Sequence, residues 1–132
     1  MKLSEAEWLE KLGPEAFRIL RKSGTEAPYS GQHTSTFPRK GLYLCVGCSN
    51  PIFAAQDKFM SKCGWPSFTT PINGEAISEH CDKSLKLERT EVRCSNCEGH
   101  LGHVFDDGPI DSGGLRYCIN SICLQYKEPT SP

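Results

Sequence analysis

Two pairs of cysteines share one spacing and one local context. Cys45 and Cys48 follow one short predicted strand, and Cys94 and Cys97 follow another, so each pair is a strand that runs into a C-x-x-C turn. Such a turn directs two thiolates towards one point, and zinc prefers four ligands of this kind at the corners of a tetrahedron. The sequence therefore predicts one structural zinc ion per chain, held by all four cysteines, with no coordination position left open.

Local disulfides and thioredoxin-like redox pairs are the alternative explanations of these turns. A redox pair of the thioredoxin kind needs a helix after its second cysteine, but Ser49, Asn50 and Pro51 follow Cys48. The matched spacings favour zinc. Because the turns lie further apart than in a compact zinc ribbon, we expect the metal to join two distant hairpins and to stabilise the folded chain.

Cys118 lies in a short segment in which apolar and polar side chains alternate. In a strand, every second residue of the range 115–119 would point to the core, beginning with Leu115. Cys118 then shares the opposite face with Arg116 and Asn120. A neighbouring guanidinium lowers the pKa of a thiol and populates the nucleophilic thiolate. An inert, half-buried cysteine remains the other explanation, because free cysteine is among the most buried residue types.

Two histidines follow the second cysteine pair at short spacing. Beside an incomplete metal site, His100 and His103 would be spare ligands or plain surface residues. With four cysteines already on the metal, both rings are free for acid–base chemistry near neutral pH. Asp107 comes four residues after His103 and is a candidate for orienting that ring.

The segment around Cys63 also contains several residues that could take part in chemistry or binding. A lysine and a glycine flank this cysteine, which predicts a flexible and exposed loop. A proline follows Trp65 and favours an extended conformation that presents the indole ring. A place in the core is the default for a tryptophan. Cys81 and Cys123 are isolated, and we interpret them as incidental thiols.

The elements that must position these residues begin with two short helices. Ser4 and Glu7 form a capping box, which predicts a helix that starts at residue 5. Gly13 ends this helix, Pro14 suits the first position of a second helix, and Gly24 is a candidate cap for its end. We therefore expect a helical arm over residues 1–24.

From Thr25 onward, short apolar runs alternate with Gly, Pro, Asn and Asp, a pattern typical of antiparallel strands joined by turns. The predicted strands are Gly41–Cys45, Pro51–Ala54, Ile77–His80, Leu85–Cys94, His103–Asp106 and Leu115–Ile119. Residues 127–132 are predicted to be a disordered tail. The expected fold is a single, mainly β domain over residues 1–132.

Length and charge exclude several classes of function. The chain has 132 residues, and 15 Lys and Arg against 16 Asp and Glu give a formal net charge of −1. Without a basic excess, we expect no nucleic-acid partner, and no apolar run is long enough to span a membrane. The N-terminal segment is acidic and amphipathic where a secretory peptide would be apolar. We therefore expect a cytoplasmic protein whose thiols stay reduced.

Five segments taken together resemble the B-type methionine-R-sulfoxide reductases. They are Cys45–Cys48, Cys63–Phe68, Arg89–Cys94, Gly99–Phe105 and Gly114–Ser121. Their order and spacing are similar to those of the family, and the resemblance extends from the N-terminal helices to about Tyr126. Enzymes of this family reverse the oxidation of methionine.

The resemblance implies a fold and a role for each matching position. The implied fold has two antiparallel sheets and N-terminal helices, with the four cysteines of the two turns as zinc ligands. Cys118 is implied as the nucleophile, Cys63 as the resolving thiol, and Trp65 as the wall that receives the substrate's methyl group. The polar side of the pocket and its support are implied for five further positions: His100, His103, Asn120, Asp107 and Arg116.

The implied chemistry uses both thiols and one proton donor. A sulfoxide oxygen leaves only when it is protonated, so a thiolate and an acid must stand on opposite sides of the S–O bond. Attack by Cys118 yields methionine and a sulfenic acid, which Cys63 condenses to a disulfide. A thioredoxin-type dithiol then restores both thiols by exchange. The shape of the pocket and the chirality of the sulfur imply specificity for the R epimer.

The expected partners are therefore oxidised methionine residues in proteins and a thioredoxin-type reductant, and we expect a monomer. Two other functions stay open on sequence grounds. A zinc-knuckle binding module would do no chemistry, and a thiol redox sensor would use Cys63 and Cys118 only as a switch. Cys123 is a second candidate for the resolving thiol, although the strand between it and Cys118 favours Cys63.

Overall fold

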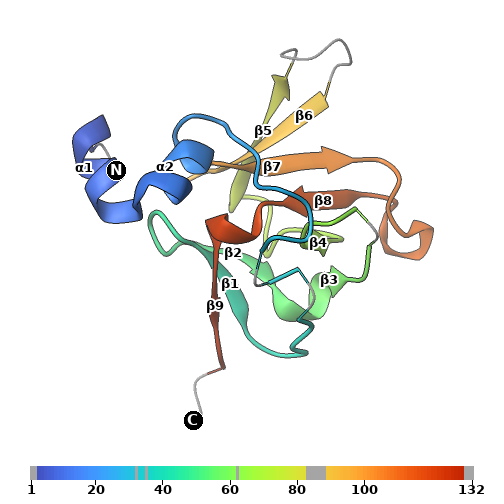
Figure 1. The fold of residues 1–132 in the computed structure, drawn as a ribbon. Coiled ribbons are helices and arrows are strands. Elements are labelled where there is room, and N and C mark those ends of the chain that lie inside the picture. Colours follow the sequence, from blue (N-terminus) through green and yellow to red (C-terminus); the bar gives the residue numbers. More distant parts are fainter. Residues whose placement is uncertain (1–2, 32, 35, 62, 83–88, 130–132) are drawn as a thin grey trace.

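A computed structural model describes residues 3–31, 33–34, 36–61, 63–82 and 89–129. Within these ranges the chain forms two α-helices, nine β-strands and three short 3-10 helices (Figure 1). The 3-10 helices are η1 (Ala55–Asp57), η2 (Ile110–Ser112) and η3 (Ser121–Cys123). In the described residues no helix is long and apolar enough to cross a membrane.

Helix α1 (Glu5–Leu12) begins where the capping box predicts. The Ser4 hydroxyl accepts a hydrogen bond from the backbone N–H of Glu7, whose carboxylate accepts one from the backbone N–H of Ser4. Helix α2 (Pro14–Leu20) has Pro14 in its first turn, as expected. The expected cap at Gly24 is wrong, because α2 already ends at Leu20.

The helical arm packs against the second cysteine turn. Trp8 of α1 and Leu20 of α2 are each 2% exposed. Arg21 follows α2, donates to the backbone carbonyl of Cys97 at 2.9 Å and lies 4.6 Å from the centre of the Trp8 ring. Helix α2 also packs against β7 and η3. The arm therefore supports both the cysteine turn and the segment that follows Cys118.

The strands form the two antiparallel sheets that were expected. The smaller sheet has the order β2-β1-β9, made of β1 (Leu42–Cys45), β2 (Pro51–Ala54) and β9 (Leu124–Lys127). The larger sheet has the order β3-β4-β8-β7-β6-β5. Its strands are β3 (Lys58–Phe59), β4 (Ser67–Phe68), β5 (Ile77–Asp82), β6 (Arg89–Cys94), β7 (His100–Phe105) and β8 (Arg116–Ile119).

Several predicted boundaries are wrong. Strand β7 begins at His100 rather than at His103, and the short strands β3 and β4 and the edge strand β9 were not predicted. Lys127 belongs to β9, so the predicted disordered tail starts too early, and its residues 130–132 lie outside the described residues. Residues 85–88 of the predicted strand Leu85–Cys94 also lie outside them.

Aromatic rings join the two sheets and form the centre of the core. Phe53 of the smaller sheet stacks on Phe68 of the larger one at 4.3 Å between ring centres. Tyr43 meets Phe68 edge-on at 5.3 Å, and Phe53 lies 6.0 Å from Tyr117. These rings are buried, and such aromatic contacts add to the free energy gained from burying apolar area.

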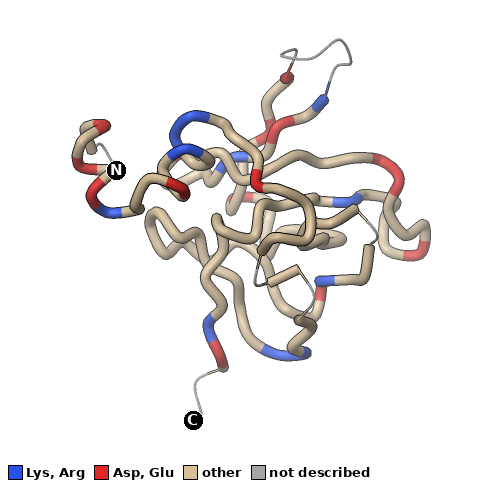
Figure 2. The backbone as a smooth tube through the Cα atoms, viewed as in Figure 1, with Lys and Arg blue, Asp and Glu red and all other residues tan. Residues whose placement is uncertain are grey.

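Strand β8 shows the alternation that places Cys118 away from this core. Tyr117 and Ile119 are buried, whereas Arg116 and Cys118 are half-buried on the opposite face. Leu115 is an exception to the prediction, because it precedes the strand and is 38% exposed. Figure 2 shows acidic and basic residues of the described chain intermingled over helices, hairpins and outer loops.

Candidate functional site

The four cysteines of the C-x-x-C turns converge in space. Their sulfur atoms all lie within 4.8 Å of one another. The Cys45 and Cys97 sulfurs are 3.7 Å apart, and those of Cys48 and Cys94 are 3.5 Å apart. A tetrahedral centre with metal–sulfur bonds of about 2.3 Å separates its sulfur atoms by about 3.8 Å. The cluster therefore has the spacing and the ligand type for one thiolate-bound metal ion.

The two turns have the same backbone geometry. Ser49 and Glu98, the residues that follow each pair, have positive φ angles of 64° and 62°. Each donates its backbone N–H to the carbonyl of the first cysteine of its turn, Cys45 or Cys94, at 2.7 Å. The matching φ angles and hydrogen bonds confirm that the two C-x-x-C turns share one structure. Because β1 and β6 belong to different sheets, a metal held by these four cysteines would join the sheets.

A second group of thiols lies apart from the metal cluster. The sulfur atoms of Cys63 and Cys118 are 3.6 Å apart, and both residues are half-buried. Strand pairing explains the approach, because Ser67 of β4 lies opposite Cys118 of β8 and the Cys63 loop leads into β4. The Cys63 sulfur also contacts the Ser67 hydroxyl at 3.4 Å.

The surroundings shift the pKa values of these two thiols in opposite directions. Burial raises the pKa of Cys63, but hydrogen bonds with Ser61 and Ser67 and smaller effects outweigh burial, and the pKa falls to about 7. Burial also raises the pKa of Cys118, and with Cys63 close by it reaches about 12, although Arg116 opposes the rise. The expected net lowering at Cys118 is therefore wrong. The pair together carries one negative charge just above neutral pH.

Cys63 and Cys118 open onto a cavity of about 170 Å³. Its wall combines aromatic rings, one histidine, one amide and two guanidinium groups. The lining residues are Thr25, Cys63, Trp65, Arg89, Gly102, His103, Phe105, Arg116, Cys118 and Asn120. Trp65 is thus a wall of the cavity and not a core residue. Small concave sites with a few convergent polar groups are typical binding sites.

The two histidines lie side by side on β7. Their ring centres are 5.5 Å apart although Leu101 and Gly102 separate His100 from His103. An irregularity in the pairing of β6 with β7 skips Leu101, which brings both rings to one face. His103 lines the cavity, whereas His100 is 3% exposed and does not. Burial lowers the pKa of His100, which favours the neutral ring.

Each histidine has a carboxylate partner that the sequence did not identify. The His103 Nε2 atom lies 2.7 Å from an Asp82 oxygen, and the His100 Nδ1 atom lies 2.7 Å from a Glu91 oxygen. Glu91 and Asp82 come from β6 and β5, one and two strands away from β7, so only the sheet order relates them to the histidines. Either carboxylate stabilises one ring orientation and one tautomer.

The expected pairing of Asp107 with His103 is wrong. Asp107 instead accepts two hydrogen bonds from Arg116, at 2.8 and 3.2 Å, and its side chain is 63% exposed. The Arg116 guanidinium lies 4.5 Å from the centre of the Phe105 ring, which is opposite it in the sheet. Arg116 therefore faces the cavity, and Asp107 only orients Arg116 from outside.

The two remaining cysteines have different surroundings. Cys123 is fully buried, its sulfur contacts the backbone carbonyl of His100 at 3.4 Å, and burial raises its pKa well above the usual range. A buried thiol of this kind is a poor candidate for a resolving thiol compared with Cys63, which contacts Cys118. Cys81 is exposed on β5.

Known proteins are similar to this chain over most of its length. The family model described as SelR domain matches residues 12–128. A peptide methionine sulfoxide reductase MsrB from Agrobacterium fabrum is 50% identical over 124 residues, which is 94% of this chain and 90% of that protein. Proteins of the same name from Chromohalobacter salexigens (48% over 123 residues, 93% and 92% covered) and Pseudomonas putida (50% over 121 residues, 92% and 91% covered) are similarly close.

The matches to these relatives cover nearly the whole of both sequences, and the residues matched by the family model, 12–128, include the two cysteine turns and both thiols of the cavity. The chain therefore belongs to the SelR family, the B-type methionine-R-sulfoxide reductases.

Proposed function

We propose that this protein reduces the R epimer of methionine sulfoxide in oxidised proteins to methionine, through Cys118 and Cys63. The observation that carries the proposal is the contact between these two sulfur atoms at the mouth of an aromatic-walled cavity that also holds His103. The cavity has a volume of about 170 Å³, which suits a single side chain, and family membership gives the reaction class.

The first step is attack by the Cys118 thiolate on the electrophilic sulfoxide sulfur. The pKa of Cys63 is lowered to about 7, so the thiol pair begins to lose one proton near neutral pH. The pKa of Cys118 is raised to about 12, so the attacking thiolate forms when the Cys118 proton passes to Cys63, and Arg116, which opposes that rise, favours the charge on Cys118. The Cys118 sulfur bonds to the sulfoxide sulfur, and His103 protonates the sulfoxide oxygen. The protonated oxygen transfers as a hydroxyl group to the Cys118 sulfur, and the bonds from the substrate sulfur to this oxygen and to Cys118 break, so methionine leaves and Cys118 becomes a sulfenic acid. Methionine sulfoxide is thus reduced and Cys118 is oxidised.

Cys63 then completes the redox change. Its sulfur attacks the sulfenic sulfur of Cys118, a disulfide forms, and the oxygen leaves as water. A thioredoxin-type dithiol reduces the disulfide through a mixed disulfide and is itself oxidised. The half-buried position of Cys63 in a loop supports access by such a partner. Operation as a monomer in the reducing cytoplasm is part of this proposal.

The binding wall explains selection between epimers. The Trp65 ring offers an apolar surface for the substrate's methyl group, while His103 and Asn120 offer polar contacts for the sulfoxide oxygen. Only one epimer places its methyl, oxygen and lone pair correctly when the thiolate attacks from Cys118. We assign zinc to the cluster of Cys45, Cys48, Cys94 and Cys97, where it would supply stability and no step of the reaction.

The proposal is tested with separated epimers of a methionine sulfoxide peptide. Purified, zinc-loaded protein is incubated with dithiothreitol and either epimer, and methionine is quantified by chromatography. We expect turnover of the R epimer only, and none with the variant Cys118→Ser. A redox sensor or a zinc-knuckle binding module would give no methionine with either epimer, and that result would refute the reductase.

A further inference from the structure

We infer that Glu26 is a positioning residue, which holds Trp65 and Asn120 in the orientation that recognises the sulfoxide. This inference rests on the proposed function. Glu26 belongs to the segment between the helical arm and β1, and it lies more than ninety positions from Asn120 in the sequence. It is 7% exposed and does not line the thiol cavity.

The peptide groups of Glu26 contact both residues of the cavity wall. Its backbone N–H donates to the Asn120 side-chain oxygen at 3.0 Å. Its backbone carbonyl accepts a hydrogen bond from the Trp65 indole N–H, also at 3.0 Å. A displacement of Glu26 therefore moves the aromatic wall and the amide together.

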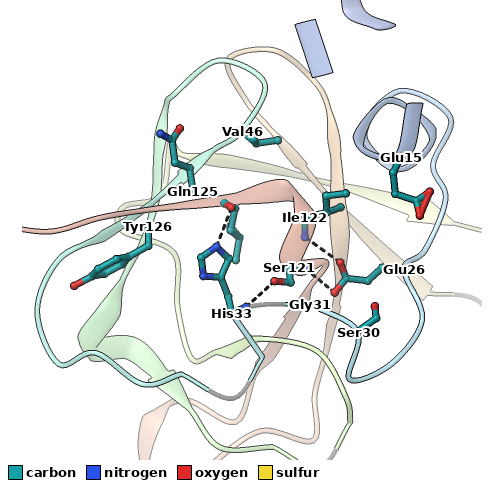
Figure 3. A pocket seen from close by; sticks show the side chains of 11 residues that line it. Glu15, Glu26, Ser30, Gly31, His33, Val46, Ser121, Ile122, Gln125 and Tyr126 are labelled. Atoms are coloured by element: carbon teal, nitrogen blue, oxygen red, sulfur yellow. Dashed lines mark hydrogen bonds between the residues drawn. The ribbon is translucent and has the colours of Figure 1, made fainter. Parts of the chain in front are cut away.

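The carboxylate of Glu26 anchors these peptide groups. One oxygen accepts the backbone N–H of Ser121 at 2.8 Å and the other accepts that of Ile122 at 2.9 Å (Figure 3). Both donors belong to η3, which starts directly after Asn120. Hydrogen bonds to a charged acceptor are roughly twice as strong as neutral ones. The carboxylate thus links the segment between α2 and β1 to η3, which follows the strand β8 that carries Cys118.

Close packing keeps this carboxylate in place. A methyl group added at Gly31 would come within 2.0 Å of Ser121 and within 2.8 Å of a Glu26 carboxylate oxygen. The two chain segments therefore approach each other as closely as glycine permits. Figure 3 shows the Glu26 side chain pointing toward Ser121 and Ile122, at the edge of a second cavity of about 850 Å³.

The hydrogen bonds also determine which way the Asn120 amide points. Its oxygen accepts from Glu26, and its nitrogen donates to the Leu101 carbonyl at 3.0 Å. A flipped amide would place donor against donor and acceptor against acceptor. Because the amide nitrogen has two N–H groups, one remains for an oxygen in the cavity that Asn120 lines. Glu26 therefore orients an Asn120 N–H group that can donate to the sulfoxide oxygen.

The test compares Glu26→Gln with Glu15→Gln. The carboxamide keeps one acceptor and turns a donor toward a backbone N–H, so one anchor is lost. Glu15 lines the same large cavity but is exposed and pairs with Arg18 on its own helix, so the control removes the same charge without touching the anchor. We expect kcat/KM for the R epimer to fall about tenfold or more in Glu26→Gln and to stay unchanged in Glu15→Gln.

Further readouts separate positioning from a general loss of stability. The rate of Cys118 alkylation and the zinc content should stay unchanged in Glu26→Gln, while its preference for the R over the S epimer should fall. In a Trp65→Phe background, which lacks the indole N–H, Glu26→Gln should cost less than in the unmodified protein. If Glu26→Gln does not fold, Glu26→Asp, which keeps both oxygens on a shorter stem, should show the same pattern with a smaller loss.

Equal kcat/KM values for both glutamine variants would overturn the inference. The inference would also be overturned if the fold-losses in kcat/KM of Glu26→Gln and Trp65→Phe multiplied in the double variant. An activity loss equal to the unfolded fraction measured by circular dichroism would overturn it as well. If the unmodified protein itself produces no methionine from the R epimer, the proposed function fails instead, and the two failures are distinguishable.

Discussion

Cys63 and Cys118 are 55 positions apart in the sequence, yet their sulfur atoms lie 3.6 Å apart. A disulfide needs about 2.05 Å, so the two sulfurs must approach by about 1.5 Å. Cys118 is held in β8 between β4 and β7, so we expect the Cys63 loop to supply this movement. The contact explains why Cys63, and not the buried Cys123, is suited to resolve a sulfenic acid on Cys118.

The first prediction concerns this division of labour. Cys118→Ser should produce no methionine, because the thiolate that attacks the sulfoxide sulfur is lost and Cys63 has only the resolving role. Cys63→Ser should produce one methionine per chain and stop at a sulfenic acid, which dimedone labelling and mass spectrometry detect. Full thioredoxin-linked turnover by Cys63→Ser would instead move the resolving role to Cys123.

The second prediction concerns pH. The first ionisation of the thiol pair lies near pH 7, because hydrogen bonds lower the pKa of Cys63 to about 7 despite its burial. Alkylation by iodoacetamide should therefore rise with pH through a midpoint near 7, since the thiolate is the reactive form. Ser67→Ala removes one of those hydrogen bonds and should raise the midpoint. Ser30→Ala, at an exposed position between α2 and β1, should leave the midpoint unchanged. A midpoint near 9 in the unmodified protein would contradict this assignment.

The third prediction concerns the proton donor. Asp82 contacts His103 at 2.7 Å, so Asp82→Asn removes a charge-assisted hydrogen bond that orients the ring. We expect kcat to fall about tenfold to a hundredfold. Asp111→Asn, in the exposed helix η2, is the matched control. An unchanged pH profile and an unchanged kcat in Asp82→Asn would argue that His103 is not the acid.

The fourth prediction concerns the metal cluster. Because the four cysteines join the two sheets, removal of zinc by a chelator should lower Tm by about 10 °C or more. Cys48→Ser should do the same, and Cys81→Ser, outside the cluster, should leave Tm and metal content unchanged. Metal analysis of the purified protein should find one zinc per chain. Less than one zinc per chain after gentle purification would contradict the assignment.

Features that depend on neighbouring residues were predictable from the sequence. The capping box at Ser4, the two C-x-x-C turns and the alternation in β8 are all set within a few residues, and the structure confirms them. The wrong inference about Asp107 shows the limit of this approach. The short spacing in the sequence suggested His103 as the partner of Asp107. In the sheet, however, Arg116 lies opposite Phe105, two residues before Asp107, and Arg116 donates the hydrogen bond to Asp107.

Features that depend on sheet order could not be predicted. Asp82 reaches His103 across two strand pairings, and the irregularity at Leu101 brings His100 beside His103. Glu26 contacts Asn120 and Ser121 only through hydrogen bonds that span more than ninety positions of the sequence. No local pattern marks any of these contacts, since each results from the tertiary arrangement of the chain.

The most direct test of the proposed mechanism is a single turnover without reductant. Reduced, zinc-loaded protein is mixed with excess R-epimer peptide, quenched by alkylation, and analysed for methionine and for cysteine state. We expect one methionine per chain and a disulfide between Cys63 and Cys118, with the four metal-cluster cysteines still reduced. Absence of methionine, or methionine formed while Cys118 remains a free thiol, would contradict the account.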